Sequence, residues 1–258
     1  MIPLSAEVIE RLSAFLWPML RISAMLLTAP PFSGSAITVR IRVMVALVLT
    51  WLVYPLHQWP VIDPASAEGV VEIFNQLLIG ASMGLTLQIV VAALAVAGQT
   101  IAATMGLSMA SMVDPNVGSV PTLSQFLILC STLIFVALGG PSLLLGLVAE
   151  SFRTLPIGTS ILTQDVYGRM LRWSSMMFVG ALLLSLPVVA TLLFVNIGLG
   201  VITRAAPSLN IFAVGFPAMI VAGFLVLILS MDVLGGRIEW LWQQSFIALR
   251  TLLGVPGG

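Results

Sequence analysis

The sequence predicts an all-helical, polytopic membrane protein built from long kinked helical hairpins with glycine and proline breaks. Of its 258 residues, 59% are hydrophobic and only 8% are charged, whereas about a quarter of a soluble domain is charged. A transmembrane helix needs roughly 20 apolar residues, and the apolar runs lack the period-two alternation of a membrane β-barrel. Five windows without Asp, Glu, Lys or Arg can hold such helices: residues 22–39, 73–113, 115–149, 173–203 and 205–231.

The first apolar run, residues 12–29, is not a clean lipid-facing helix, because it contains Pro18 and Arg21. Acidic residues precede it without a basic leader region, so we expect no cleavable signal peptide. A Pro-Pro break at residues 30–34 separates this run from a second one, residues 43–56, which Arg40 and Arg42 introduce. The next helix is expected to begin at residues 63–64, because Asp-Pro suits a helix start.

Residues 70–149 predict two helices joined by a polar connection. The first helix is rich in small residues, and the second, residues 122–138, ends at a Gly-Gly-Pro break at residues 139–141. Between them, residues 106–121 contain Gly, Pro, Asn, Asp and Ser. Such a loop is tolerated at membrane depth only where protein or a water-filled cavity surrounds it.

The C-terminal part predicts a kinked helix, a second irregular stretch and an amphipathic tail. A helix over residues 173–195 contains Pro187, which favours a kink. The irregular stretch is expected from Gly198 to Pro217, before a last apolar run over residues 218–234. Residues 236–253 have one apolar helical face, which we expect on a membrane surface or on a partner. The whole chain, residues 1–258, is expected to form one membrane domain.

The charges indicate which classes of partner are improbable. The net charge is zero, so no nucleic-acid partner is implied, and the absence of lysine excludes a Walker-type phosphate loop. The arginines do not alternate between successive loops, as they do in a simple bundle of membrane spans. This favours helices buried partly against protein rather than lipid.

Residues 80–84 can be interpreted in two ways. The pattern from Gly80 through Ser82 to Gly84 matches a nucleophile elbow, which requires a strand-to-helix turn and a nearby histidine. The same residues form a Gly-x-x-x-Gly helix-packing face, and their apolar helical context favours this interpretation. The one histidine, His57, has no second His or Cys to complete a zinc site. We therefore expect no enzyme, metal or cofactor chemistry.

Two features of residues 105–116 leave a choice open. Asp114 is the only charge between Glu72 and Glu150. An intramembrane carboxylate suggests a proton relay or an ion site, but the Asp-Pro-Asn sequence favours a turn, which is the preferred interpretation. The methionines of this region suit core packing and an adaptable surface equally well; they are Met105, Met109 and Met112.

Several of these segments together resemble the FliR family of the flagellar type III export apparatus. The most specific is residues 106–115, Gly-Leu-Ser-Met-Ala-Ser-Met-Val-Asp-Pro, joined by the break at 30–32, the Arg-x-Arg at 40–42 and residues 198–217. The resemblance runs along nearly the whole chain. Virulence injectisome proteins of the SctT type share this fold and are an alternative, although residues 12–31 are more similar to the flagellar proteins.

The resemblance implies a core subunit of the flagellar export gate, through which unfolded flagellar subunits pass. It implies assembly with FliP and FliQ in a helical arrangement, with FlhB, FlhA, rod-proximal proteins and export substrates as further partners. The location implied is the bacterial inner membrane within the flagellar basal body, with parts raised to the periplasmic side.

The resemblance also assigns residues. Family members place the segment matching 106–121 inside the gate as a plug, and some carry aromatic residues where this chain has methionines. The plug residues so implied are Gly106, Leu107, Ser108, Met109, Met112, Asp114 and Pro115, and those of the second irregular stretch are Arg204, Pro207, Asn210, Phe212, Gly215 and Pro217. Apolar, deformable methionines suit a seal that excludes water and yields to a passing chain.

Two other classes of function remain open. A secondary transporter would also have glycine- and proline-broken helices at its substrate site. An intramembrane hydrolase would use Ser82 as its nucleophile.

Overall fold

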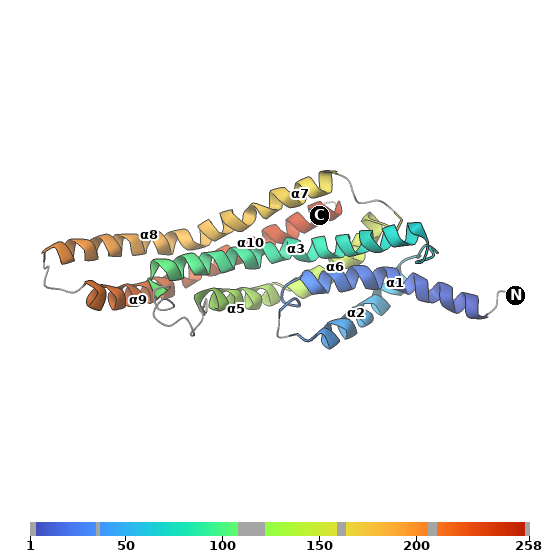
Figure 1. Cartoon of the computed structure of the whole chain (residues 1–258), viewed down its shortest axis with the longest axis horizontal. Coiled ribbons are helices and arrows are strands. Elements are labelled where there is room, and N and C mark those ends of the chain that lie inside the picture. The colour runs from blue at the N-terminus through green and yellow to red at the C-terminus, as the bar shows by residue number, and fades with distance from the viewer. Residues whose placement is uncertain (1–3, 35–36, 108–121, 159–163, 206–210, 256–258) are drawn as a thin grey trace. The chain divides into compact units, whose positions relative to one another are not determined.

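The structure is a computed structural model that describes residues 4–34, 37–107, 122–158, 164–205 and 211–255. All regular elements in these ranges are helices (Figure 1), which confirms the predicted all-helical class. In chain order they are α1 (Leu4–Thr28), α2 (Val39–Val53), the short 3-10 helix η1 (Tyr54–Leu56), α3 (Ala67–Thr104), α5 (Thr122–Ala137), α6 (Gly140–Thr154), α7 (Gln164–Ser174), α8 (Met176–Ala205), α9 (Ile211–Leu229) and α10 (Met231–Leu253).

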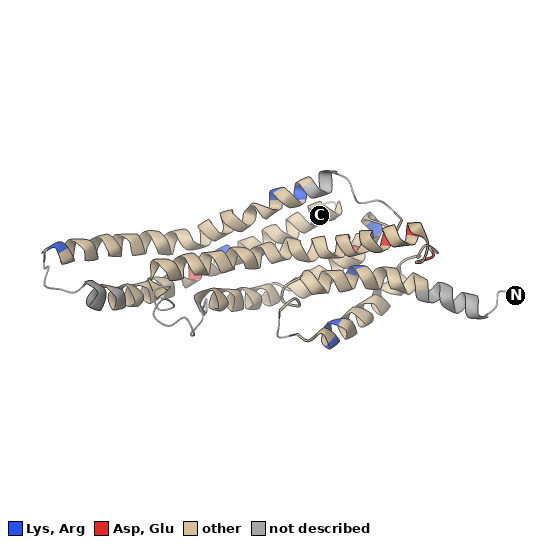
Figure 2. Cartoon of the chain, in the orientation of Figure 1, with Lys and Arg blue, Asp and Glu red and all other residues tan. Residues whose placement is uncertain are grey.

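Three segments are long and apolar enough to cross a membrane: Val39–Leu56, Ala67–Thr104 and Gly168–Ala205. Two pairs of helices, α5 with α6 and most of α9 with α10, meet the same criterion as bent spans with a short break, which raises the number to as many as five. Figure 2 shows that charged residues are sparse along these helices. The prediction of a polytopic membrane protein with broken helices is confirmed.

The described chain divides into two compact units. Unit 1 contains residues 1–89, 139–174 and 243–258, and unit 2 contains residues 90–138 and 175–242. Helix α3 therefore begins in unit 1 and ends in unit 2, whereas α10 begins in unit 2 and ends in unit 1.

The core of unit 1 forms where α1 packs closely on α3. A side chain at Gly80 would collide with the carbonyl oxygen of Arg21 and lie 2.9 Å from the Cβ atom of Ala24. A side chain at Gly84 would lie 2.6 Å from the backbone nitrogen of Ala29. The two glycines therefore let the helix backbones approach closely, as small residues do in membrane helix pairs. Helices α1 and α2 also pack together as a hairpin (Figure 1).

The core of unit 2 is centred on Trp242, whose side chain is 1% exposed. Its indole nitrogen donates hydrogen bonds to the hydroxyl and carbonyl oxygens of Ser131, at 2.9 and 3.2 Å. The centroid of the Phe135 ring lies 4.6 Å from the centroid of the Trp242 ring. Because a buried indole N–H needs an acceptor, these contacts fix the orientation of α10 on α5. Helices α8 and α9 pack together as a second hairpin.

Helix α3 begins later than the Asp-Pro sequence predicts. It starts at Ala67, and the hydroxyl of Ser66 accepts a hydrogen bond from the backbone N–H of Gly69 at 3.0 Å. The carboxylate of Asp63 instead accepts the N–H of Ala65, also at 3.0 Å. Asp63 thus closes the preceding turn, whereas Ser66 caps the helix.

Helices cover most of the predicted second irregular stretch. Helix α8 continues through Gly198 and Gly200 to Ala205, and α9 resumes at Ile211 and includes Gly215 and Pro217. Glycine and proline are tolerated inside membrane helices more readily than in soluble ones. The prediction of irregular structure over residues 198–205 and 211–217 was therefore wrong, and residues 206–210 lie outside the described part.

The C-terminal helix also differs from its prediction. It begins at Met231 rather than at residue 236, since Gly235 and Gly236 continue the helix. Its apolar face is buried by the chain itself rather than lying on a membrane surface: Ile238, Leu241 and Trp242 in unit 2, and Phe246, Leu249 and Leu252 in unit 1. An amphipathic face alone does not reveal which surface covers it.

Candidate functional site

The candidate plug segment, residues 106–121, starts from a helix end that only glycine suits well. Helix α3 ends at Thr104, and Gly106 has a φ of +80°, the left-handed conformation that side chains disfavour. Its N–H donates to the carbonyl of Ala103 at 3.0 Å. This cap stops α3 at a defined residue, as glycine commonly does at helix C-termini. Leu107 follows and is half-buried.

The residue before that cap is anchored to another helix of unit 2. The side chain of Met105 is 0% exposed. A Cβ atom at Gly223 of α9 would lie 2.5 Å from Cγ and Cε of Met105 and 2.8 Å from its Sδ. The thioether therefore rests on bare backbone, and α9 holds the end of α3.

The far end of the segment is anchored in the same unit, near the start of α5. The hydroxyl of Ser124 donates to the carbonyl of Ala95 on α3 at 2.9 Å. A Cβ atom at Gly98 would lie 2.5 Å from Cα of Ser124. Both ends of residues 108–121 are thus attached to α3, at Gly106 through the chain and at Ser124 by contact. The described residues on either side of the candidate plug segment are therefore held to the same helix.

The remaining predicted residues are placed as follows. Ser108, Met109, Met112, Asp114 and Pro115 lie outside the described residues, as do Pro207 and Asn210. Arg204 is exposed near the end of α8, and Gly215 and Pro217 lie within α9, half-buried and exposed respectively. Phe212 is also in α9, and its side chain is outside the described part. The structure therefore describes the frame of the predicted site rather than the proposed sealing side chains.

The second reading of residues 80–84, a nucleophile elbow, lacks its structural context. All five residues lie inside α3 rather than at a strand-to-helix turn. The hydroxyl of Ser82 donates to the carbonyl of Ile79 at 2.7 Å, within its own helix. Gly80 and Gly84 instead lie at the α1–α3 contact described above.

Sequence reasoning missed a buried polar cluster in unit 1, centred on Arg21. Its guanidinium, 0% exposed, donates to Gln76 Oε1 at 2.7 Å, to the carbonyl and hydroxyl oxygens of Ser151 at 2.8 and 3.0 Å, and to the carbonyl of Leu155 at 2.8 Å. The ring of Phe152 lies 4.2 Å from Cζ of Arg21. A buried charge is tolerated only when it is paired and hydrogen-bonded in this way.

The negative partner of this cluster is Glu72, itself 3% exposed. Its carboxylate accepts hydrogen bonds from Gln76 at 2.5 Å and from Asn75 at 3.3 Å, so Gln76 bridges it to Arg21. The spacing of residues 72, 75 and 76 places all three on one face of α3. That polar face on an apolar helix, together with an arginine in the first apolar run, was the signal that could have predicted the cluster.

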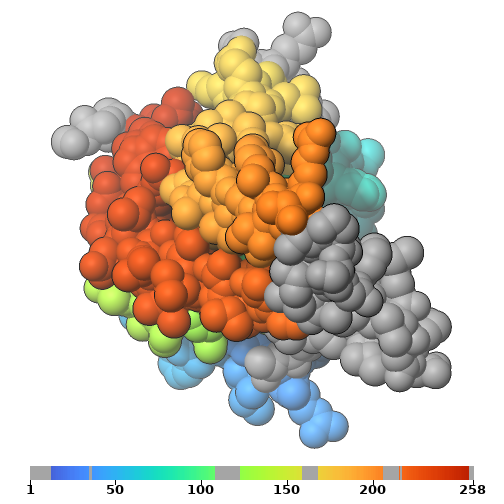
Figure 3. Space-filling model, turned by 90° about the vertical axis from the view of Figure 1, so that its left-hand side faces the viewer, coloured from blue at the N-terminus to red at the C-terminus, as the bar shows by residue number. Residues whose placement is uncertain are grey.

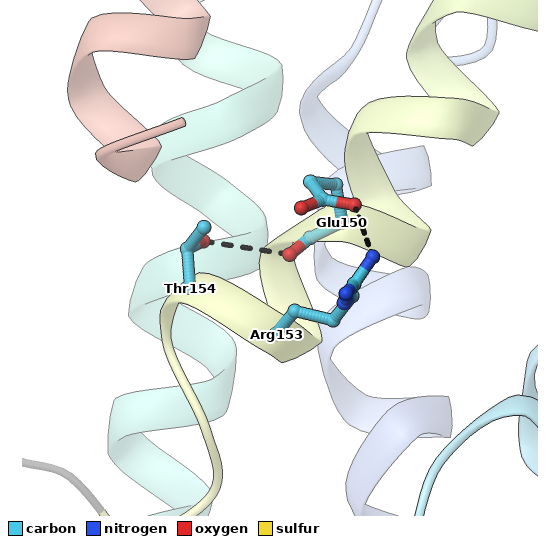
Figure 4. A network of polar contacts seen from close by, with 3 residues as sticks. All are labelled: Glu150, Arg153 and Thr154. Atoms are coloured by element: carbon cyan, nitrogen blue, oxygen red, sulfur yellow. Dashed lines mark hydrogen bonds and ion pairs between the residues drawn. The ribbon is translucent and has the colours of Figure 1, made fainter. Parts of the chain in front are cut away.

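In contrast to the buried cluster of Arg21 and Glu72, an ion pair on α6 is exposed to solvent. Arg153 lies 3.6 Å from the carboxylate of Glu150, one helical turn away (Figure 4), with the two side chains 71% and 38% exposed. The hydroxyl of Thr154 donates to the carbonyl of Glu150 at 3.5 Å. Exposed pairs of this kind contribute about 0–1 kcal/mol. The helix therefore places its structurally important polar contacts on the side facing Arg21.

No group of three or more His, Cys, Asp or Glu side chains that could hold a metal ion occurs among the described residues. The cluster around Arg21 consists of hydrogen-bonded side chains, and the contacts of Met105 and Ser124 beside the plug segment are packing and one hydrogen bond. Neither places a nucleophile beside a base.

The chain is similar to known bacterial proteins along most of its length. Residues 12–245 match the family described as bacterial export proteins, family 1. The chain is 34% identical to the flagellar biosynthetic protein FliR of Pectobacterium carotovorum subsp. carotovorum, over 96% of each chain. It is 31% identical to that of Escherichia coli K12, over 96% of each, and 28% identical to that of Bacillus subtilis 168, over 97% of this chain and 98% of the relative.

Proposed function

Since the chain belongs to family 1 of the bacterial export proteins, the family of the flagellar biosynthetic proteins FliR, we propose that it is a core subunit of the flagellar type III protein export gate. In this role it assembles with FliP and FliQ into the channel through which unfolded flagellar subunits leave the cell. FlhB, FlhA and rod-proximal proteins are its further partners, and the subunit itself catalyses no reaction.

The observation that best supports an assembled rather than solitary protein is the length of the apolar helices. Two candidate spans, Ala67–Thr104 and Gly168–Ala205, are each 38 residues long. At 1.5 Å per residue, each extends about 57 Å, nearly twice the roughly 30 Å of bilayer hydrocarbon. Tilts of membrane helices range up to about 40°, which is too little to fit such a length. Part of each helix therefore lies beyond the lipid.

The surface of the second of these helices remains apolar along its length. Its exposed large apolar side chains begin at Leu171 and continue past Phe194 to Ile202. Figure 3, which views the molecule from the side at the left of Figure 1, shows orange atoms of α8 beside red-orange atoms of the helices that follow it. Apolar surface that extends beyond lipid requires protein to cover it. Partner subunits of an export gate supply that cover, whereas a solitary transporter does not.

The frame of residues 106–121 supports a plug at this position. A gate must exclude ions when idle and yield when a chain passes. A loop attached at both ends can move between its anchors without detaching, and the methionines within it form a deformable apolar seal. The location that follows is the inner membrane within the flagellar basal body, with the lipid-free helix ends on the periplasmic side.

Purification in mild detergent tests the assembly. The tagged full chain, expressed together with FliP and FliQ, should elute as one large hetero-oligomer that contains both of them. A monomer or homodimer under the same conditions would contradict the proposal and favour a solute transporter. As a separate test of the hydrolase alternative, Ser82→Ala should leave flagellar assembly unchanged, because the hydroxyl of Ser82 donates within its own helix.

A further inference from the structure

Unit 1 contains a cleft of about 430 Å3 that the export function leaves without a role. Helix α7 forms one wall, and α3 and the last turns of α10 form the others. The side chains that matter for its chemistry are Arg169, Arg172, Trp173, Thr86, Thr251 and Leu252.

The polar lining of this cleft is basic. Two of its residues are arginines, and none of its described lining residues is an acid. The Nε atom of Arg169 is buried and has no hydrogen-bond partner among the described residues. A buried donor left unpaired costs about 1–3 kcal/mol, and more when it is charged. An anionic acceptor in the cleft that reaches this guanidinium would remove that cost.

Apart from Thr86 and Thr251, the rest of the cleft lining is largely apolar. The indole nitrogen of Trp173 donates to the carbonyl of Thr86 at 2.8 Å, which fixes the ring as a wall of the cleft. Met170 and Leu252 add aliphatic surface. A ligand that suits this lining carries a phosphate at one end and an apolar portion at the other.

The position of the arginines along the chain narrows the ligand class. Arg169 and Arg172 stand in the first turns of the apolar segment Gly168–Ala205, and the next charge after them is Arg204 at its other end (Figure 2). Arginine and tryptophan at the end of a membrane span lie at the level of the lipid headgroups. Basic pockets between membrane helices bind acidic headgroups there.

We propose that this cleft binds the phosphate of an anionic phospholipid. Arg169 and Arg172 contact the phosphate oxygens, with the planar guanidinium of each suited to two parallel hydrogen bonds. Trp173 and Leu252 contact the start of the acyl chains. The bound lipid fixes α7 against α10 within unit 1. The proposal is independent of the export function, since it concerns a surface outside the candidate plug.

Lipid titration of the purified full chain in detergent, followed by native mass spectrometry, tests this. The probes are phosphatidylglycerol, zwitterionic phosphatidylcholine and inorganic phosphate. We expect phosphatidylglycerol to bind at least tenfold more tightly than phosphatidylcholine. Equal binding of the two lipids would overturn the proposal. Saturation of the same site by inorganic phosphate at similar concentrations would overturn the lipid as ligand and leave a free phosphate site.

Substitutions locate the site. Arg169→Gln with Arg172→Gln should weaken phosphatidylglycerol binding about tenfold or more, since each arginine contributes on the order of a fivefold attraction to acidic lipid. The control is Arg153→Gln, which removes one arginine charge from an exposed position of unit 1 outside the cleft and should change nothing. An equal loss in the control would overturn the location. If the double variant fails to fold, Arg169→Lys, which keeps the charge but loses the planar fork, should still bind several-fold more weakly.

Discussion

The side chain of Met105 rests directly on the backbone of Gly223, so that only this side chain separates the end of α3 from the middle of α9. Met105 is fully buried there, and the next residue, Gly106, ends the helix with a φ of +80°. This contact fixes the point at which the candidate plug segment leaves the helical frame.

Replacing Gly223 with alanine should destabilise the chain. The new Cβ would fall 2.5 Å from two Met105 atoms, including Cγ, which cannot move far without a change of rotamer. Overpacking of this kind costs about 1–3 kcal/mol. Thermal unfolding of the purified chain measures the effect, and Met105→Ala in the same chain should recover part of the loss.

The matched control for that substitution is Gly235→Ala. Gly235 lies inside α10, and a Cβ atom there would meet nothing within 4 Å. Alanine favours a helix by about 1 kcal/mol over glycine, so this variant should be neutral or slightly more stable. A similar loss in both variants would show that the Met105 contact is not the cause.

Gly106→Ala should lower stability by about 1–2 kcal/mol, the cost of a left-handed conformation for a residue with a side chain. Asparagine, which tolerates that conformation better, should cost less. Thermal unfolding of both variants gives the comparison. Equal stability of wild type and the alanine variant would contradict the helix cap described here.

Arg21→Met should destabilise the chain by about 3–5 kcal/mol, because it leaves the buried Glu72 without its positive partner. The carbonyls of Ser151 and Leu155 would also lose a donor. Combining Arg21→Met with Glu72→Met should cost less than the sum of the single changes, since neither charge then remains unpaired. Strict additivity in that double-mutant cycle would mean that the two residues do not interact.

Gly80→Ala should separate α1 from α3, since the added methyl collides with a backbone carbonyl that cannot turn aside. We expect a loss of about 2–3 kcal/mol in thermal unfolding. Gly146→Ala in α6, where a Cβ would meet nothing within 4 Å, is the control and should not destabilise. If Gly80→Ala did not lower the thermal stability, the close approach of α1 and α3 would be contradicted.

Much of this fold could be predicted from the sequence, because the bilayer allows few solutions. Charge-free windows predicted the membrane helices, and the Gly-Gly-Pro sequence predicted the break between α5 and α6, where Gly139 has a φ of +70°. These features depend on local composition and on residues with restricted or unusual backbone conformations.

The features that sequence reasoning missed depend on contacts between distant residues. Arg21 and Gln76 are 55 positions apart, and Trp242 and Ser131 are 111 apart, so no local pattern joins them. The second irregular stretch was overestimated for a related reason. Glycines such as Gly198 weaken a helix in water, but an apolar environment offers the backbone no other hydrogen-bond partner.

The sealing role of the methionines tests the gate function most directly. The Met109→Ala, Met112→Ala double variant should assemble with its partners but leak ions, because the smaller side chains no longer exclude water from an apolar constriction. The control is Met44→Ala in α2, a side chain that is 66% exposed and outside the plug segment. The measurement is the membrane potential of cells that produce each variant complex. We predict a loss of potential in the double variant alone; a normal potential with the complex intact would contradict the account.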